Sequence, residues 1–233
     1  MPGRNSAPLK QHLKGIVILH EDRDLLVVDK PPGLLTIATD REQERTAYHI
    51  LTDYVRKGSA RSRNRIFIVH RLDRETSGIL IFAKSEKAKF HLQGGWEETE
   101  KRYLAVIHGR LENRAGTITT TLTENRAHRV YSTPDPTQGR LSHTAYDVLK
   151  ETKLFSLLEV RLLTGRKHQI RVHLAEKGHP VVGDKRYGKE GDGHRRLALH
   201  ARSISFQHPF SGQRLTFETS IPGYFNELVG NLT

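Results

Sequence analysis

One aspartate has the surroundings of a reactive group. Asp73 lies in a short polar segment between two strongly apolar runs, Ile66–Val69 and Ile79–Ala83. If these runs are buried strands, the core holds the backbone of Asp73 while its side chain can face a cleft. Arg71 and Arg74 are close in sequence and favour the ionised carboxylate. Such a carboxylate can act as a nucleophile or a base, but residue type alone favours a structural ion-pair cluster, which is commoner.

The absence of cysteine and the spacing of the histidines exclude several classes of site. The chain has 14 histidines and no cysteine. Disulfides, thiolate metal ligands and a cysteine nucleophile are therefore excluded. The histidines show no paired ligand spacing, and His168 and His173 are five residues apart on an expected helix, which puts them on different faces. We expect no metal site.

The charge of the chain indicates a polyanionic partner. Lys and Arg number 38 against 26 acidic residues, which gives a formal net charge of +12. A membrane surface is the less favoured partner, because no segment combines a basic face with a long apolar one. Seven basic residues precede or flank Asp73, and we expect them to follow a phosphate backbone instead of forming a merely solvated face. They are Arg56, Lys57, Arg61, Arg63, Arg65, Arg71 and Arg74.

The order of the expected elements predicts the fold class. We expect strands at 16–19, 25–28, 66–69, 79–83, 103–107, 117–122, 144–149, 155–163, 197–206 and 215–218, and helices at 47–55, after Ser85, at 167–177 and near the C-terminus. Strands mostly follow one another, so we predict an α+β fold with a bent, mostly antiparallel sheet, flanking helices and a central catalytic cleft. Residues 1–14 are expected to form a loose basic arm and residues 15–233 the catalytic domain. Residues 188–194 form a glycine-rich loop.

Four ordered segments resemble the signatures of RluA-type pseudouridine synthases. The run His70–Leu80 (HRLDRETSGIL) is similar to the family's HRLD segment, and Lys30–Leu34 (KPPGL) to its KPxGL turn. Lys101–Ala105 (KRYLA) resembles its K-x-Y-x-A strand, and Thr164–His173 (TGRKHQIRVH) its TGRxHQIRVH segment. Shorter matches follow at 178–188, 199–201 and 208–209, so the resemblance extends from about Leu25 to the C-terminus.

The resemblance implies an activity and assigns roles. It implies that a uridine in structured ribosomal or transfer RNA is isomerised without a cofactor, with Asp73 as the nucleophile. It implies that Tyr103 stacks on the flipped uracil and that Arg166 pairs with Asp73; a core tyrosine and a phosphate contact are the alternatives. A further set of residues is expected to bind the substrate: His70, Arg71, Arg74, Ile170, Leu199, Arg61, Arg63 and Arg65.

Individual members of that set have alternative roles. Arg71 is expected to fill the space left by the flipped base, or else to contact a phosphate. Core packing is an equal interpretation for Ile170 and Leu199. Many members of the family carry an N-terminal S4-type domain, which fourteen residues cannot form, and Thr36 stands near a position where relatives often have a histidine.

The remaining expectations concern the whole protein. We expect a monomer. We also expect a cytoplasmic protein, because the first apolar run, Ile16–Leu19, is too short for a signal peptide or a membrane span. The alternative function is a catalytically silent RNA-binding module. A hydrolase of the glycosidase type would need a second positioned acid, and no partner motif for Asp73 is evident.

Overall fold

The computed structural model describes residues 12–39, 42–59 and 61–232. Twelve strands in this part of the chain form a single sheet. They are β1 (His12–Leu13), β2 (Ile16–Glu21), β3 (Leu25–Lys30), β4 (Phe67–Ile68), β5 (Ser77–Ala83), β6 (Glu100–His108), β7 (Ala115–Glu124), β8 (Val130–Thr133), β9 (Arg140–Glu151), β10 (Phe155–Leu162), β11 (Leu199–Gln207) and β12 (Arg214–Glu218). The helices are α1 (Ala47–Arg56), α2 (Glu86–Gly94), α3 (Gln169–Glu176) and α4 (Gly223–Val229), with 3-10 turns at Trp96–Glu98 and Pro136–Gln138.

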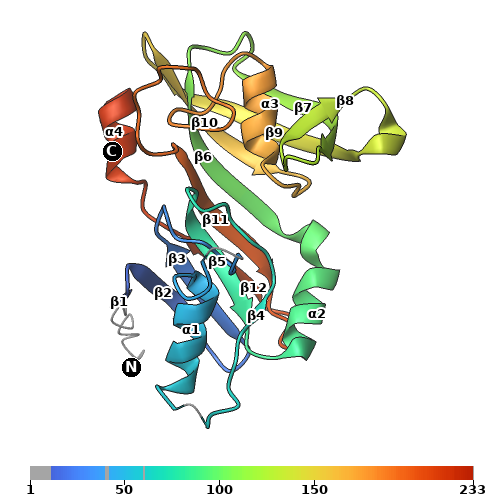
Figure 1. Cartoon of the computed structure of the whole chain (residues 1–233), viewed down its shortest axis with the longest axis vertical. Coiled ribbons are helices and arrows are strands. Elements are labelled where there is room, and N and C mark those ends of the chain that lie inside the picture. Colours follow the sequence, from blue (N-terminus) through green and yellow to red (C-terminus); the bar gives the residue numbers. More distant parts are fainter. Residues whose placement is uncertain (1–11, 40–41, 60, 233) are drawn as a thin grey trace, which may run out of the picture.

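The sheet joins the two halves of the chain. Its strand order is β1-β2-β3-β5-β11-β6-β10-β9-β7-β8, with β12 paired to β11 and β4 to β5. Every pairing is antiparallel except that of β5 with β11. Figure 1 shows β6 and β11 in the middle of the molecule, between a lower part with α1 and α2 and an upper part with α3. The expected mixed and mostly antiparallel sheet is confirmed.

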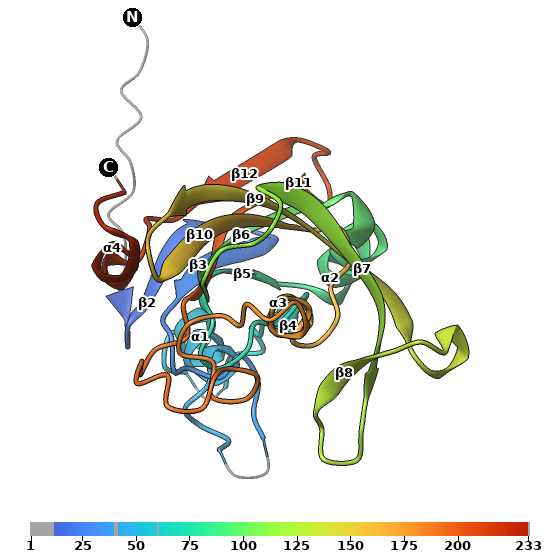
Figure 2. The same ribbon diagram turned by 90° about the horizontal axis from the view of Figure 1, so that it is seen from above.

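Alternating side chains cover both faces of the lower sheet. Leu26 and Val28 of β3 pack with α1, whereas Leu25 and Val27 of the same strand pack with α2. This is the two-residue period of a strand that is buried on both faces. Seen from above, the sheet arches over α1 and α3 (Figure 2). The concave side therefore holds the helices that border the site described below.

Local signals placed several elements correctly. Ser85 caps α2 by accepting a hydrogen bond from the backbone N–H of Ala88, and β11 and β12 form the expected hairpin. Other bounds differ: β4 has two residues, and α3 begins at Gln169 because His168 adopts a left-handed backbone (φ 55°). Strand β8 was not expected.

The N-terminal arm is partly structured. Residues 1–11 of the expected arm lie outside the described residues. His12 and Leu13, which follow them, form β1 and pair with β2.

Gly78 permits the one parallel pairing. It has φ +109°, and a Cβ atom there would lie 2.3 Å from the carbonyl oxygen of Ala201 in β11. Only glycine allows this close approach of the two backbones. The glycine that ends the HRLDRETSG segment thus joins β5, which follows Asp73, to the C-terminal half of the sheet. No helix in the described part of the chain is long and apolar enough to cross a membrane.

Candidate active site

Asp73 lies in the loop between β4 and β5, and the turn after β3 fixes that loop. The buried Lys30 donates hydrogen bonds from Nζ to the carbonyl oxygens of Pro31, Leu34 and Arg74 at 2.8–3.1 Å. The N–H of Gly33 also donates to the Arg74 carbonyl at 2.9 Å. The KPPGL turn is therefore a backbone support for the Asp73 loop.

Thr36 supports the other side of the same loop. Its hydroxyl donates to the carbonyl of Leu72 at 2.8 Å and accepts the N–H of Leu72 at 3.2 Å. Both backbone groups of the residue before Asp73 are thus satisfied by one buried side chain. Thr36 therefore has a structural role in this protein.

Burial depresses the pKa of Lys30. Desolvation lowers the pKa to about 7, while the carboxylates of Glu75, Asp73 and Asp29 oppose the shift. The three carbonyl acceptors match the three N–H bonds of a charged ammonium. Deprotonation would remove one of these donors from the support of the Asp73 loop.

Arg171, not Arg166, pairs with Asp73. Arg171 Nη1 donates to Asp73 Oδ2 at 2.8 Å, while Nε and Nη2 donate to the two carboxylate oxygens of Asp184 at 2.7 and 2.8 Å. The Asp184 side chain is fully buried, and that of Asp73 is 23% exposed. The guanidinium is thus held by a buried carboxylate on one edge and orients a partly exposed one on the other.

The predicted pairing of Arg166 with Asp73 is wrong. Arg166 is exposed, its backbone N–H donates to Gln169 Oε1, and no ion pair in the described residues joins its side chain to Asp73. The helix begins at Gln169, so Arg166 lies in the loop before it and Arg171 lies on its first turn. A signal for Arg171 was present: an arginine between Ile170 and Val172 on a short helix is buried, and a buried guanidinium requires carboxylates.

His168 lies beside the other oxygen of Asp73. Its Nε2 is 3.6 Å from Asp73 Oδ1, and its Nδ1 is 2.8 Å from the hydroxyl of Tyr187. That hydroxyl accepts the backbone N–H of Val130 at 3.1 Å, so its own proton can be donated to Nδ1. The carboxylate of Asp73 next to Nε2 favours the tautomer with the His168 proton on Nε2.

Burial keeps the His168 ring neutral. Desolvation lowers the pKa of His168 to about 4, although the negative charge of Asp73 opposes the shift. The left-handed backbone of His168 is uncommon for a residue with a side chain and is typical of functional sites. Asp73 is thus approached by one permanent cation and one neutral N–H. His168 belongs to the Thr164–His173 segment, but no role beside Asp73 was predicted for it from the sequence.

A small pocket opens beside Asp73. Its walls include Tyr103 of β6, Ile170 of α3, Leu199 of β11 and Leu72, with Arg71 and Arg166 at its rim. Ile170 and Leu199 are both buried core residues and pocket walls, so both interpretations of them hold. Burial, followed by the charge of Asp73, raises the pKa of Tyr103, which keeps its phenol neutral. The pocket therefore offers apolar and aromatic surface next to a carboxylate.

The remaining predicted site residues are divided between three places. Arg71 and Arg74 are exposed beside Asp73, where Arg74 forms an ion pair with Glu42. His70 faces away: its Nε2 accepts the N–H of Ile81, its ring lies 4.7 Å from that of Trp96, and burial lowers its pKa to about 3. This geometry gives His70 a structural contact and no place in the pocket.

The arginines of the 58–65 loop lie elsewhere. Arg63 and Arg65 border a separate hollow at the end of α1, and Arg61 is exposed on the same loop. The run of basic residues is continuous in sequence, but Arg63 and Arg65 border this hollow whereas Arg71 and Arg74 border the one beside Asp73.

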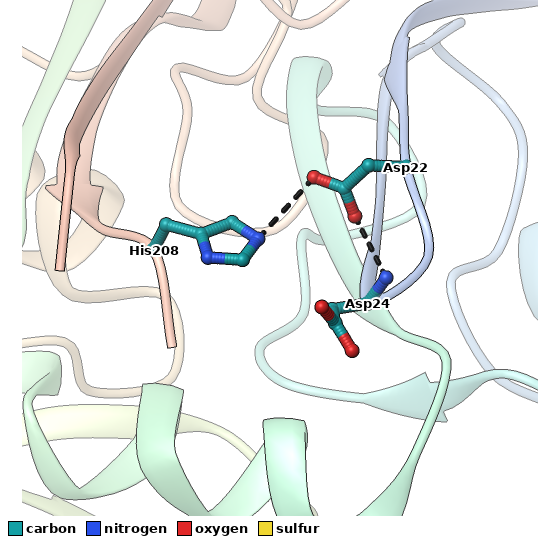
Figure 3. A group of neighbouring side chains, drawn as sticks. All are labelled: Asp22, Asp24 and His208. Carbon is teal, nitrogen blue, oxygen red and sulfur yellow. Dashed lines mark hydrogen bonds and ion pairs between the residues drawn. The ribbon is translucent and has the colours of Figure 1, made fainter. Parts of the chain in front are cut away.

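One group of side chains has the composition of a metal site. Asp22, Asp24 and His208 have possible ligand atoms within 4.8 Å of one another (Figure 3). Asp22 Oδ1 already accepts the N–H groups of Asp24 and Leu25, and Oδ2 pairs with His208 and with His20. These contacts explain the group as a capped turn joined to the end of β11.

The comparisons with known proteins agree with this geometry. Residues 24–176 match the family model described as RNA pseudouridylate synthase. An uncharacterized RNA pseudouridine synthase of Mycobacterium bovis is 36% identical over 93% of this chain and 73% of that protein. Ribosomal large subunit pseudouridine synthase D of Nitrosomonas europaea is 36% identical over 88% of this chain and 62% of that protein.

A solved structure agrees as well. The human RNA pseudouridylate synthase domain containing 1 protein has a TM-score of 0.73 and 27% identity, and the match covers 98% of this chain and 89% of that one. The ordered motifs around Asp73, the fold and the sequence matches agree, and this chain belongs to the RluA-type family of RNA pseudouridine synthases.

Proposed function

We propose that the protein isomerises specific uridines of structured RNA to pseudouridine, with Asp73 as the nucleophile. The observation that carries the proposal is the position of Asp73, at the mouth of an apolar pocket with Oδ2 fixed by Arg171. A held carboxylate with one oxygen oriented by a cation is suited to attack from the other oxygen. Oδ1 has no donor within hydrogen-bonding distance in the described residues, which leaves it available to the substrate.

The reaction requires no external oxidant or group donor. The bond between N1 of uracil and C1′ of ribose breaks, the base turns, and a C5–C1′ bond forms. C5 loses its proton to solvent and N1 takes up a proton from solvent, so the product is an isomer of the substrate. Asp73 is proposed to form a transient covalent bond with either the sugar or the base. Oδ1 can serve either route, because Arg171 occupies only Oδ2.

The pocket supplies a place for the detached base. Tyr103 offers a ring face on which a uracil can stack, and such stacking contributes about 1–3 kcal/mol per base. Ile170 and Leu199 supply apolar walls that exclude water from the base while it turns. The neutral Nε2–H of His168 would donate to Asp73 or to a substrate oxygen without adding a positive charge.

Large-subunit ribosomal RNA is the first RNA to test, because one relative is named for it, and transfer RNA is the second. The base must leave its stack to reach Asp73. Arg71 is exposed at the rim of the pocket, where it is proposed to occupy the vacated space.

A catalytically silent RNA-binding module is the alternative function. Such a module would need the basic surface but not Asp73, a buried Arg171–Asp184 pair and an apolar base pocket in one place. This combination favours the enzyme.

The test is pseudouridine formation by wild-type protein and by Asp73→Asn and Asp73→Ala variants. Ribosomal and transfer RNA from cells without the gene are incubated with each protein and mapped by chemical modification of pseudouridine. We expect modification by the wild type and none by either variant, with RNA affinity unchanged within about threefold. Turnover by Asp73→Ala would refute the mechanism, and no modification of any RNA by the wild type would favour the silent module.

A further inference from the structure

A basic hollow of about 890 Å³ lies apart from the Asp73 pocket. It is bordered by the C-terminal end of α1, by β4 and by the N-terminal end of α2 (lower part of Figure 1). We propose that this hollow is a second RNA-binding site that holds backbone phosphates of the substrate outside the modified nucleotide. The identity of the RNA as substrate rests on the proposed function.

The lining of the hollow is strongly positive. Two carboxylates, Glu21 and Glu86, face five cations. The cations are Arg23, Lys57, Arg63, Arg65 and Lys84. They come from four segments: the β2–β3 turn, the end of α1, the 58–65 loop and the residue after β5. Cations from separate segments that gather at one hollow are more specific than a charge run on one solvated loop.

The three arginines among these cations have no carboxylate partner in the described residues. Lys84 pairs with Glu21 at 2.7 Å. Arg23, Arg63 and Arg65 form no ion pair within the part of the chain that the structure describes. The guanidinium of Arg65 lies 4.7 Å from the centroid of the Phe67 ring, which limits its motion. Unpaired guanidinium groups present planar donors that match phosphate oxygens.

The position of the hollow makes it a separate site. Asp73 precedes β5 and Lys84 follows it, and seven extended residues span about 20 Å. Arg71 and Arg74 remain beside Asp73. A nucleotide bound at Asp73 therefore leaves the hollow empty, and an RNA that continues for several nucleotides can reach both sites. The hollow would select for RNA that extends beyond the target nucleotide.

The chemistry favours RNA over an acidic protein segment. The lining combines guanidinium groups with two aromatic side chains, Phe67 under Arg65 and Tyr54, and this combination suits a strand of phosphates and bases. Isolated carboxylates of a peptide would match only the charge.

Salt dependence of RNA binding tests the proposal. The variant Arg23→Gln, Arg63→Gln, Arg65→Gln removes the three arginines of the hollow. The matched control is Arg110→Gln, Lys153→Gln, Lys177→Gln. It removes the same charge from three exposed residues near the C-terminal end of β6, none of which lines the hollow. The probe is a fluorescent 20-nucleotide oligouridine, and its affinity is measured between 50 and 300 mM salt.

We expect the hollow variant to flatten the slope of log affinity against log salt by about 2, since each lost contact with a single strand contributes about 0.7. The control should change the slope by less than half of that amount. Hydrogen exchange should show that the oligouridine protects residues 61–69 in the wild type and not in the hollow variant. Equal slopes for the two variants, or no protection of this segment, would overturn the proposal. Polyglutamate is tested in the same way. If it binds the wild type as tightly as oligouridine does and the hollow variant loses both, the hollow would be assigned to an acidic protein instead.

The same titrations in an Asp73→Ala background separate this proposal from the proposed function. The hollow should bind oligouridine with the same slope when Asp73 is absent. If the wild type modifies no RNA but the slopes differ as expected, the catalytic proposal fails and the RNA site stands. If modification occurs and the slopes are equal, only the second site fails.

Discussion

Arg171 holds Asp73 with one edge of its guanidinium and is itself held by Asp184 with the other. The Nη1–Oδ2 distance to Asp73 is 2.8 Å, and both Asp184 oxygens accept from the same guanidinium. Asp184 also accepts the N–H groups of Arg186 and Tyr187, so its position is fixed by the backbone. The orientation of Asp73 therefore depends on residues about one hundred positions away in sequence.

Arg171 and Arg166 should differ sharply when each is substituted. Arg171→Lys keeps the charge but cannot bind both carboxylates, so we expect the single-turnover rate to fall about 100-fold, the cost of a misplaced reacting group. Arg166→Ala should reduce the rate less than about tenfold. Rates are measured by tritium release from 5-labelled uridine at saturating protein, and thermal unfolding confirms that both variants fold. Equal rate losses would contradict the structural assignment.

His168 should be a neutral ring with its proton on Nε2. Because its pKa is lowered to about 4, the folded protein binds this proton only below about pH 4, whereas an unfolded histidine binds it near 6.5. The stabilisation of the folded protein by neutral His168 is therefore fully present above pH 6.5, and the free energy of unfolding decreases as the pH falls from 6.5 towards 4. Nitrogen-15 NMR of labelled histidine at pH 6–7 identifies the tautomer.

Tyr187→Phe is the matched variant for that experiment. It removes the hydroxyl donor to Nδ1 and keeps the ring. We expect a mixture of His168 tautomers and a rate loss of roughly threefold to tenfold with unchanged RNA affinity, because one neutral hydrogen bond contributes about 1 kcal/mol. A pure Nδ1–H tautomer in the wild type would refute the assignment.

Lys30→Met should change how stability depends on pH. The native pKa of about 7 lies below the usual value of 10.5, so between these values the unfolded state binds more protons and the free energy of unfolding rises with pH. Wild type should therefore gain roughly 1–4 kcal/mol relative to Lys30→Met between pH 7 and 10. Urea unfolding across this range measures the difference. A constant difference would show that Lys30 does not titrate there.

Arg71→Ala separates base flipping from phosphate binding. Flipping costs a few kcal/mol of stacking only where a stack exists, and a guanidinium in the gap recovers part of it. The variant should therefore slow modification strongly in a structured stem-loop and weakly in an unstructured strand of the same local sequence. Tritium release on the matched pair gives both rates. Similar losses on both RNAs, relieved at low salt, would make Arg71 a phosphate contact.

Local sequence determined much of the lower part of this molecule. Apolar runs specified the central strands, Ser85 specified the start of α2, and the segment around Asp73 carried the family signature. These features depend on residues that are neighbours in the chain, because strand burial, capping and turns are short-range effects. The α+β class followed from their order.

Only the tertiary structure decided which arginine faces Asp73. Arg166 and Arg171 belong to one motif, and the left-handed backbone at His168 puts the first in solvent and the second in the core. Likewise, the basic residues between Arg56 and Arg74 form one run in sequence but border two hollows. Arg63 and Arg65 precede β4 and line the hollow at the end of α1, whereas Arg71 and Arg74 follow β4 and lie beside Asp73. Pairing between distant segments is set by the packing of the whole sheet, which residue type and spacing do not encode.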